Sequence, residues 1–266
     1  MQQMETEARI LRVTVEYERE TFYNKWGKVF PDSKRKESLI LDGENETLEC
    51  YQDEDGISCM QRYHLPSKME NPLRVFASLD FFDSPTMMYG DVLPDPNVIE
   101  VFTITAEYAD GVKKQRRGNF NRLELPPDYQ EFIQLIEYLK DYGHSEILSY
   151  RKANRMPRRK SDLMFCRVSF HPGERTYSYL CEIPTIQCGT WVLVPVGKEN
   201  RMAVGYVERV EYRQPDNAPF PLDRIKKISC ECTQQTLQDL EKSFTEEDKA
   251  KKCFHSAISA VPIVRL

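Results

Sequence analysis

The apolar run at residues 191–196, with the glycines that bound it, constrains the fold more than any other part of this sequence. The run reads Trp-Val-Leu-Val-Pro-Val, and Gly189 and Gly197 supply turns on either side. β-Branched and apolar residues between turn residues predict a short buried strand. Upstream, Tyr177 and Tyr179 stand two residues apart, so an extended strand places both rings on one face.

A further strand is predicted over residues 203–212, where apolar residues alternate with charged ones. Short strands joined by tight turns form small barrels or sandwiches, and we predict a small β-barrel over residues 164–228. Aromatic rings on the solvent side of such a barrel indicate a binding surface rather than a catalytic core.

Residues 165–228 also resemble a known family. An aromatic-x-Tyr strand is followed by Gly-x-x-Val-x-Val-Pro-x-Gly and then by Gly-x-Val. This order resembles the N-terminal DNA-3′-end-binding domain of the primosomal replication-restart helicase, where such a strand and glycine shape a pocket for a terminal nucleotide. The resemblance implies that Tyr177 and Tyr179 are stacking or pocket residues and that Gly189 is the pocket glycine. The family's acidic residue between the two aromatics is Ser178 here.

Charge is distributed unevenly along the chain. Residues 1–143 contain 27 acidic and 17 basic side chains, a balance of −10, whereas residues 144–266 contain 15 and 20, a balance of +5. Basic residues beside exposed aromatics are typical of a surface that binds single-stranded nucleic acid. The alternative is a solvated linker between domains. The basic residues predicted to bind nucleic acid are Arg151, Lys152, Arg155, Arg158, Arg159, Lys160 and Arg175.

The first half of the chain predicts an antiparallel sheet with two packed helices. Alternating or β-rich segments predict strands at residues 10–17, 38–42, 47–51, 57–63, 99–108 and 113–120. Helical spacing of apolar residues follows Pro66 and again follows Pro127. We therefore predict an α+β fold with four parts: an α+β domain at 1–143, a basic linker at 144–163, the barrel at 164–228 and a helical C-terminal segment at 229–266.

One set of cysteines and a histidine has metal-ligating chemistry, although we expect it to hold no metal, and no catalytic site is indicated. Cys230, Cys232, Cys253 and His255 form Cys-x-Cys followed by Cys-x-His, which could supply a tetrahedral shell for zinc. The alternative is that these cysteines are small buried apolar residues, as free thiols often are. The four histidines match no known nucleophile or metalloprotease pattern. We expect no cofactor and no enzymatic activity.

Three hypotheses for function follow. In the first, the protein binds single-stranded or 3′-ended DNA through the barrel and the basic linker. In the second, it is a protein-interaction module, for example an accessory or inhibitory protein acting on a nucleic-acid enzyme, whose acidic first half docks onto a partner with a basic surface. The third is an unrecognised enzyme, for which the sequence offers no set of residues. The chain has no Gly-x-x-x-x-Gly-Lys-Ser/Thr loop for a nucleoside triphosphate, no apolar run that spans a membrane and no signal peptide, so we expect a cytoplasmic protein.

Overall fold

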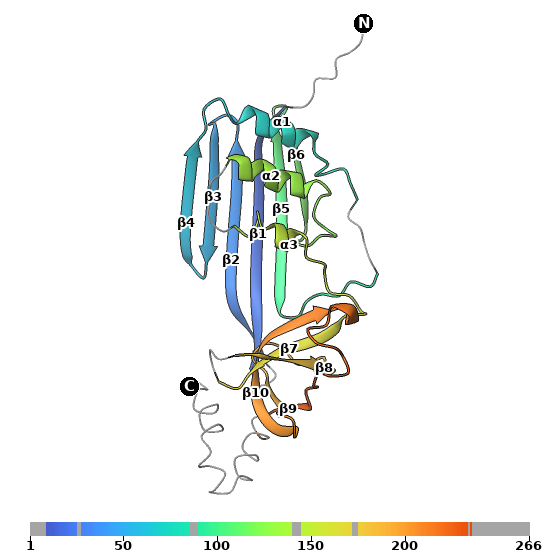
Figure 1. Ribbon diagram of the computed structural model, residues 1–266. Helices are drawn as coiled ribbons and strands as arrows, with labels where there is room; N and C mark the ends of the chain where they lie inside the picture. The colour runs from blue at the N-terminus through green and yellow to red at the C-terminus, as the bar shows by residue number, and fades with distance from the viewer. Residues whose placement is uncertain are drawn as a thin grey trace. The chain divides into compact units, whose positions relative to one another are not determined.

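The computed structural model describes residues 9–25, 28–85, 90–139, 145–171, 175–233 and 235, which fall into two units (Figure 1). The first unit comprises Met1–Thr21 and Ser33–Pro157, and the second comprises Phe22–Asp32 and Arg158–Leu266. The predicted α+β class is wrong, because 48% of the chain is strand and 12% is helical, in two antiparallel sheets. The fold is mainly β.

A sheet of six strands in the order β4-β3-β2-β1-β5-β6 lies mostly in the first unit, and the parts of β1 and β2 within Phe22–Asp32 are assigned to the second. Inward positions alternate along each strand, as Val13, Val15 and Tyr17 do in β1, and these side chains are fully buried. The other face of the sheet carries charged cross-strand pairs such as Lys36 with Glu18. The strands are β1 Ile10–Lys25, β2 Lys28–Asp42, β3 Thr47–Glu54, β4 Ile57–His64, β5 Val98–Tyr108 and β6 Lys113–Asn119.

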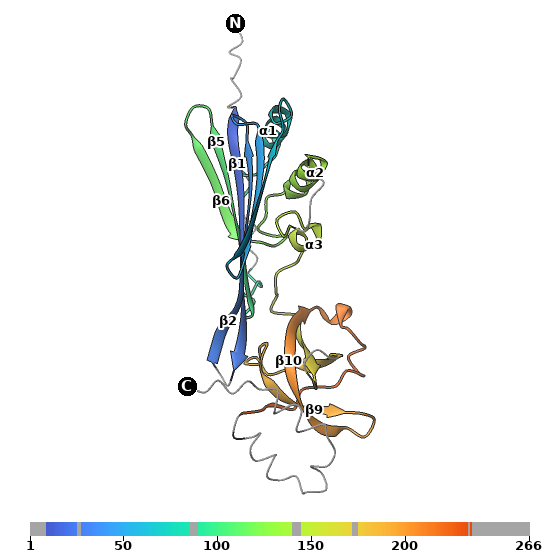
Figure 2. The same ribbon diagram turned by 90° about the vertical axis from the view of Figure 1, so that its left-hand side faces the viewer.

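Three helices lie on one face of this sheet (Figure 2). They are α1 Glu70–Ser78, α2 Tyr129–Leu139 and the single turn α3 Tyr150–Ala153. Aromatic rings fill the layer between α1, α2 and the sheet; Phe76 and Phe132, for example, meet edge to face with ring centroids 5.8 Å apart. Residues 145–157, predicted as part of a basic linker, belong to this unit, and Ile147 and Ala153 are part of its core.

The second unit contains β7 Leu163–Ser169, β8 Tyr177–Cys181, β9 Trp191–Val196, β10 Arg201–Arg213 and β11 Cys230–Glu231. Its sheet has the order β11-β9-β10-β7-β8. The segment at residues 226–232 closes this sheet on itself. Lys227 bridges to Leu180 of β8, and Cys230 pairs with Leu193 of β9. Closure of this kind removes the free edges of a small sheet.

The C-terminal segment corrects another part of the prediction. A helical segment was predicted for residues 229–266, but Cys230–Glu231 form strand β11, antiparallel to β9. The rest of that prediction falls on residues 234 and 236–266, which lie outside the described residues. Among the helices that the structure describes, none has the length and apolar character needed to cross a membrane.

Candidate functional site

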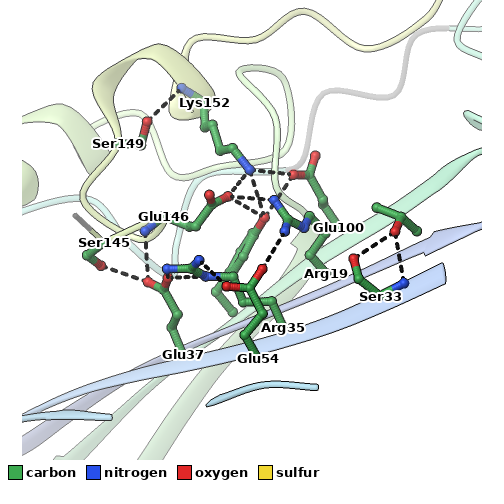
Figure 3. A network of polar contacts seen from close by, with 12 residues as sticks. Arg19, Ser33, Arg35, Glu37, Glu54, Glu100, Ser145, Glu146, Ser149 and Lys152 are labelled. Carbon is green, nitrogen blue, oxygen red and sulfur yellow. Dashed lines mark hydrogen bonds and ion pairs between the residues drawn. The ribbon is translucent and has the colours of Figure 1, made fainter. Parts of the chain in front are cut away.

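A network of charged side chains lies between the helix-bearing face of the six-stranded sheet and the segment at residues 145–155 (Figure 3). Strands β1, β2, β3 and β5 supply one side of the network, and the segment supplies the other. Four carboxylates and four cations are joined by hydrogen bonds and ion pairs around one tyrosine hydroxyl. Its members are Tyr17, Arg19, Arg35, Glu37, Glu54, Glu100, Glu146, Lys152 and Arg155.

Glu37 is the buried centre of one half of this network, with 2% of the residue exposed. Its Oε2 accepts hydrogen bonds from the Ser145 hydroxyl at 2.8 Å and from the backbone amides of Glu146 at 2.8 Å and Ile147 at 3.3 Å. Its Oε1 accepts from Nε of Arg35 at 2.7 Å. One carboxylate therefore holds the start of the 145–155 segment against the sheet.

Glu100 is the centre of the other half. Its Oε1 accepts from the Tyr17 hydroxyl at 2.8 Å and from Nζ of Lys152 at 3.1 Å, and its Oε2 forms an ion pair with Arg155. Burial by itself would raise the pKa of Glu100, but the nearby Arg155 and Lys152 charges outweigh it and lower that pKa. Burial and the Glu100 charge raise the pKa of Tyr17, so its hydroxyl remains a donor.

The remaining members of the network form ion pairs in which each charge faces one of opposite sign. Glu146 pairs with Lys152 and with Arg19, whose Nη1 lies 3.5 Å from Oε2 of Glu146. Glu54 pairs with Arg35 at 3.1 Å and with Arg19 at 3.4 Å. Because each charge has a partner of opposite sign inside the chain, the network fixes the segment in place and presents no unpaired charge to a ligand.

The alternation of buried positions along the strands marks two members of this network in the sequence. Glu37 and Glu100 stand at inward positions of their strands, in step with the buried Leu39 and Phe102. A charged residue in the apolar phase of an alternating strand indicates a buried ion pair. Lys152, which the sequence assigned to a nucleic-acid surface, is one of the partners.

The predicted aromatic pair of the second unit has one exposed ring and one buried ring. The Tyr177 side chain is 46% exposed, whereas Tyr179 is 5% exposed and its hydroxyl donates to the carbonyl oxygen of Pro195 at 3.3 Å. The Phe170 ring lies 5.7 Å from that of Tyr177, and the Arg175 guanidinium lies 5.5 Å from the Tyr177 ring centroid. The Tyr177 cluster therefore consists of the exposed Tyr177 and Arg175 with the half-buried Phe170.

The other predicted nucleic-acid residues are divided between the two units. The Arg158 guanidinium stacks 3.9 Å from the ring centroid of Tyr212. Gly189 has a φ of 90° and its amide donates to the Val207 carbonyl oxygen at 2.8 Å, so it makes a turn that favours glycine. Arg151 and Lys160 are exposed. Arg151, Lys152 and Arg155 belong to the first unit, and Arg158, Arg159, Lys160 and Arg175 belong to the second.

Two of the four predicted zinc ligands can be placed. Cys232 is buried, and burial raises the pKa of its thiol to about 12, which disfavours the thiolate that binds metal. Cys230 is half-buried beside it. Cys253 and His255 lie outside the described residues. Within the part of the chain that the structure describes, no three Cys, His, Asp or Glu residues are grouped as a metal site.

Strand β4 forms an unpaired edge that the sequence did not reveal. It pairs with β3 at all eight positions, and no strand of the described residues pairs with its outer side. Ile57 is 82% exposed and Met60 is 61% exposed, and Arg62 is the strand's one Lys, Arg, Asp or Glu residue. The opposite edge, β6, has the sequence KKQRRGN, in which lysine and arginine discourage further pairing.

The hairpin before β4 determines which backbone groups face outward. Asp55 and Gly56 have φ angles of 53° and 85°, as in a two-residue type I′ turn. In such a hairpin the flanking residues Glu54 and Ile57 form a hydrogen-bonded pair. Along the rest of the strand, non-hydrogen-bonded and hydrogen-bonded pairs then alternate. The outward amides and carbonyls of β4 therefore belong to the even-numbered residues, Ser58, Met60, Arg62 and His64.

Comparisons with known proteins give no relative from which a function could be transferred. No family model, no curated protein and no solved structure matches the chain. The resemblance of residues 165–228 to a DNA-3′-end-binding domain therefore stays a prediction. Within the described residues, the features that bear on function are the charged network, the Tyr177 cluster and the β4 edge.

Proposed function

We propose that this chain is a non-enzymatic protein-interaction module whose β4 strand accepts an extended segment of a protein partner as an added strand. The observation that supports this proposal most directly is the regular, almost uncharged outer edge of β4. Natural sheets protect such edges with charges, proline or covering segments, and strand addition uses edges that lack this protection. β6 of the same sheet has that protection.

Both faces of β4 offer apolar contacts to an added strand. Ile57 pairs with Glu54 and Cys59 pairs with Gln52, so each lies on the same face of the sheet as its partner. These β3 positions share the face of the buried Leu48, which is the helix-bearing face. Met60 lies on the opposite face. Main-chain hydrogen bonds would supply affinity, and contacts with alternate side chains would supply specificity.

The acidic balance of the first half does not define a single docking face. On the open face of the sheet, acidic side chains pair across strands with basic ones, as Glu49 does with Arg62 at 2.9 Å and Glu107 with Lys113 at 2.7 Å. Such pairs are solvated and weak, but they neutralise the surface locally. The edge of β4 is therefore a more specific binding feature than net charge.

Short random peptides displayed on phage should reveal this edge. We expect the full chain to enrich peptides of alternating β-branched sequence. Met60→Pro should weaken their binding about fivefold or more, because proline removes an outward amide and a lost hydrogen bond of this kind is worth on the order of 1 kcal/mol. Proline is tolerated on an edge strand where its nitrogen faces outward. Binding is measured by fluorescence anisotropy.

Met202→Ala is the matched control, because Met202 is a similarly exposed methionine, 47% accessible, in β10. This variant should bind the peptides as the natural chain does. Peptides that bind Met60→Pro with undiminished affinity would show that β4 is not the docking strand.

Nucleic-acid binding is a second candidate, favoured by the exposed Tyr177 ring beside Arg175. A stacked base contributes about 1–3 kcal/mol, so Tyr177→Ala should weaken single-stranded DNA binding by roughly fivefold to a hundredfold. Anisotropy of labelled single-stranded and 3′-tailed DNA at low and physiological salt measures this effect. Phe220→Ala, at another exposed ring of the second unit, is the control. If the natural chain binds no DNA even at low salt, this candidate is eliminated.

A further inference from the structure

We propose that the strand added to β4 is β4 of a second copy of this chain, paired antiparallel about a two-fold axis at Met60. The proposal rests on the proposed function, because it names the occupant of the same edge. The product is a symmetric dimer in which two six-stranded sheets become one continuous sheet. Symmetric pairing of this kind closes after two copies.

The alternation of side chains restricts the register. A two-fold axis between antiparallel strands leaves both helix-bearing faces on the same side, so odd-numbered residues face odd-numbered ones. When the pairing is centred on Met60, Met60 of one copy lies opposite Met60 of the other, and Ile57 of each copy lies opposite Tyr63 of the other. These three residues are the large apolar side chains of the strand. Moving the axis to Gln61 would place Met60 opposite Arg62 and Gln61 opposite Gln61, so both apolar pairs would be lost.

The backbone groups match in the same register. The outward amides and carbonyls belong to the even-numbered residues, as the Asp55-Gly56 turn requires. Met60 then exchanges two hydrogen bonds with its own copy, and Ser58 exchanges two with Arg62 at each end of the pairing. About six main-chain hydrogen bonds form in total, as expected for three hydrogen-bonded pairs.

Charge does not oppose this pairing along the edge. Arg62 faces Ser58, so no like charges stand directly opposite each other. The acidic turns at residues 53–55 lie at opposite ends of the joined strands. Asp55 of one copy is ten residues from Asp55 of the other along the strand direction, or about 33 Å at the usual rise. That separation is several times the Debye length of about 8 Å at physiological salt.

The mass of the full chain, measured by light scattering after size exclusion across a wide concentration range, tests the proposal. We expect the mass to approach that of a dimer as concentration rises. Met60→Pro should raise the dimer dissociation constant about tenfold or more. Circular dichroism and thermal unfolding must show that this variant is folded, and Met202→Ala must dimerise like the natural chain.

A charge series at Ser58 tests the register. Because Ser58 faces Arg62 of the other copy, Ser58→Glu should tighten the dimer and Ser58→Lys should weaken it, with dissociation constants that differ by about fivefold or more. Both substitutions are at an exposed position, so both variants should fold. Equal dissociation constants for the two variants would overturn the Met60-centred register.

Three results would overturn the second copy as occupant. The first is a monomer at every concentration; the second is a dimer that Met60→Pro leaves unchanged. The third is growth into larger species, which indicates pairing of β4 with the basic β6 edge of another copy. If the chain is monomeric but displayed peptides still require the Met60 amide, the proposed function stands and only the identity of the occupant is wrong.

Discussion

Glu37→Ala is expected to lower the free energy of unfolding by about 3–5 kcal/mol, the range for breaking a buried ion pair. The substitution removes both oxygens that accept from Ser145, from the amides of Glu146 and Ile147, and from Arg35. The buried amide of Ile147 and the part-buried amide of Glu146 would then lack this acceptor, and the desolvation cost of the buried one would remain. The 145–155 segment should separate from the sheet before the rest of the unit unfolds.

Urea unfolding followed by circular dichroism measures the loss, and hydrogen exchange at the amides of Glu146 and Ile147 shows where it arises. Glu54→Ala is the matched control, because Glu54 binds the same Arg35 but its side chain is 50% exposed. An exposed pair contributes about 1 kcal/mol or less. If the two variants lose the same stability, Glu37 is not the residue that fixes the segment.

The stability of the first unit should fall as the pH drops below about 4.5, and Glu100 should cause part of that fall. Burial opposes the charge on Glu100, but Arg155 and Lys152 outweigh burial and lower its pKa from the usual 4.5. Its ionised form therefore stabilises the fold above that pH, and this stabilisation is lost as pH falls through the lowered pKa. Protonation would leave both cations without their shared partner.

Glu100→Gln isolates this contribution. The variant should be about 2 kcal/mol less stable at neutral pH, because it loses charge-assisted hydrogen bonds, and its melting temperature should depend less on pH between neutral and acid solution than that of the natural chain. Calorimetry over that range measures both effects. Glu107→Gln, in an exposed pair with Lys113, should leave the pH profile unchanged. Parallel profiles for the natural chain and Glu100→Gln would contradict the assignment.

Local sequence patterns predicted some elements well. The run at 191–196 is strand β9, and the strand predicted at 57–63 is β4. The same patterns underestimated β2, predicted at 38–42 but observed at Lys28–Asp42. Residues 32–37 of this strand are all polar and have weak strand propensity, so their conformation depends on pairing with neighbouring strands rather than on their own residues.

The candidate sites depend on contacts that a local pattern cannot supply. Glu37 lies 108 residues from Ser145 in sequence, and Tyr17 lies 83 residues from Glu100. Likewise, β4 is an edge only because β1 lies between β2 and β5 in the strand order. A single strand pattern indicates which residues face inward, but not which strand is its neighbour. For that reason the sequence suggested the Tyr177 cluster and missed both the network and the β4 edge.

The discontinuous second unit has a consequence for biosynthesis. Phe22–Asp32 belong to this unit, yet the rest of it begins at Arg158. Because domains form as the chain emerges from the ribosome, Phe22–Asp32 must wait while all of Ser33–Pro157 is translated before the rest of their unit exists. The second unit is therefore expected to complete its fold only after Arg158 and the strands that follow it have left the ribosome, although its first residues are made early.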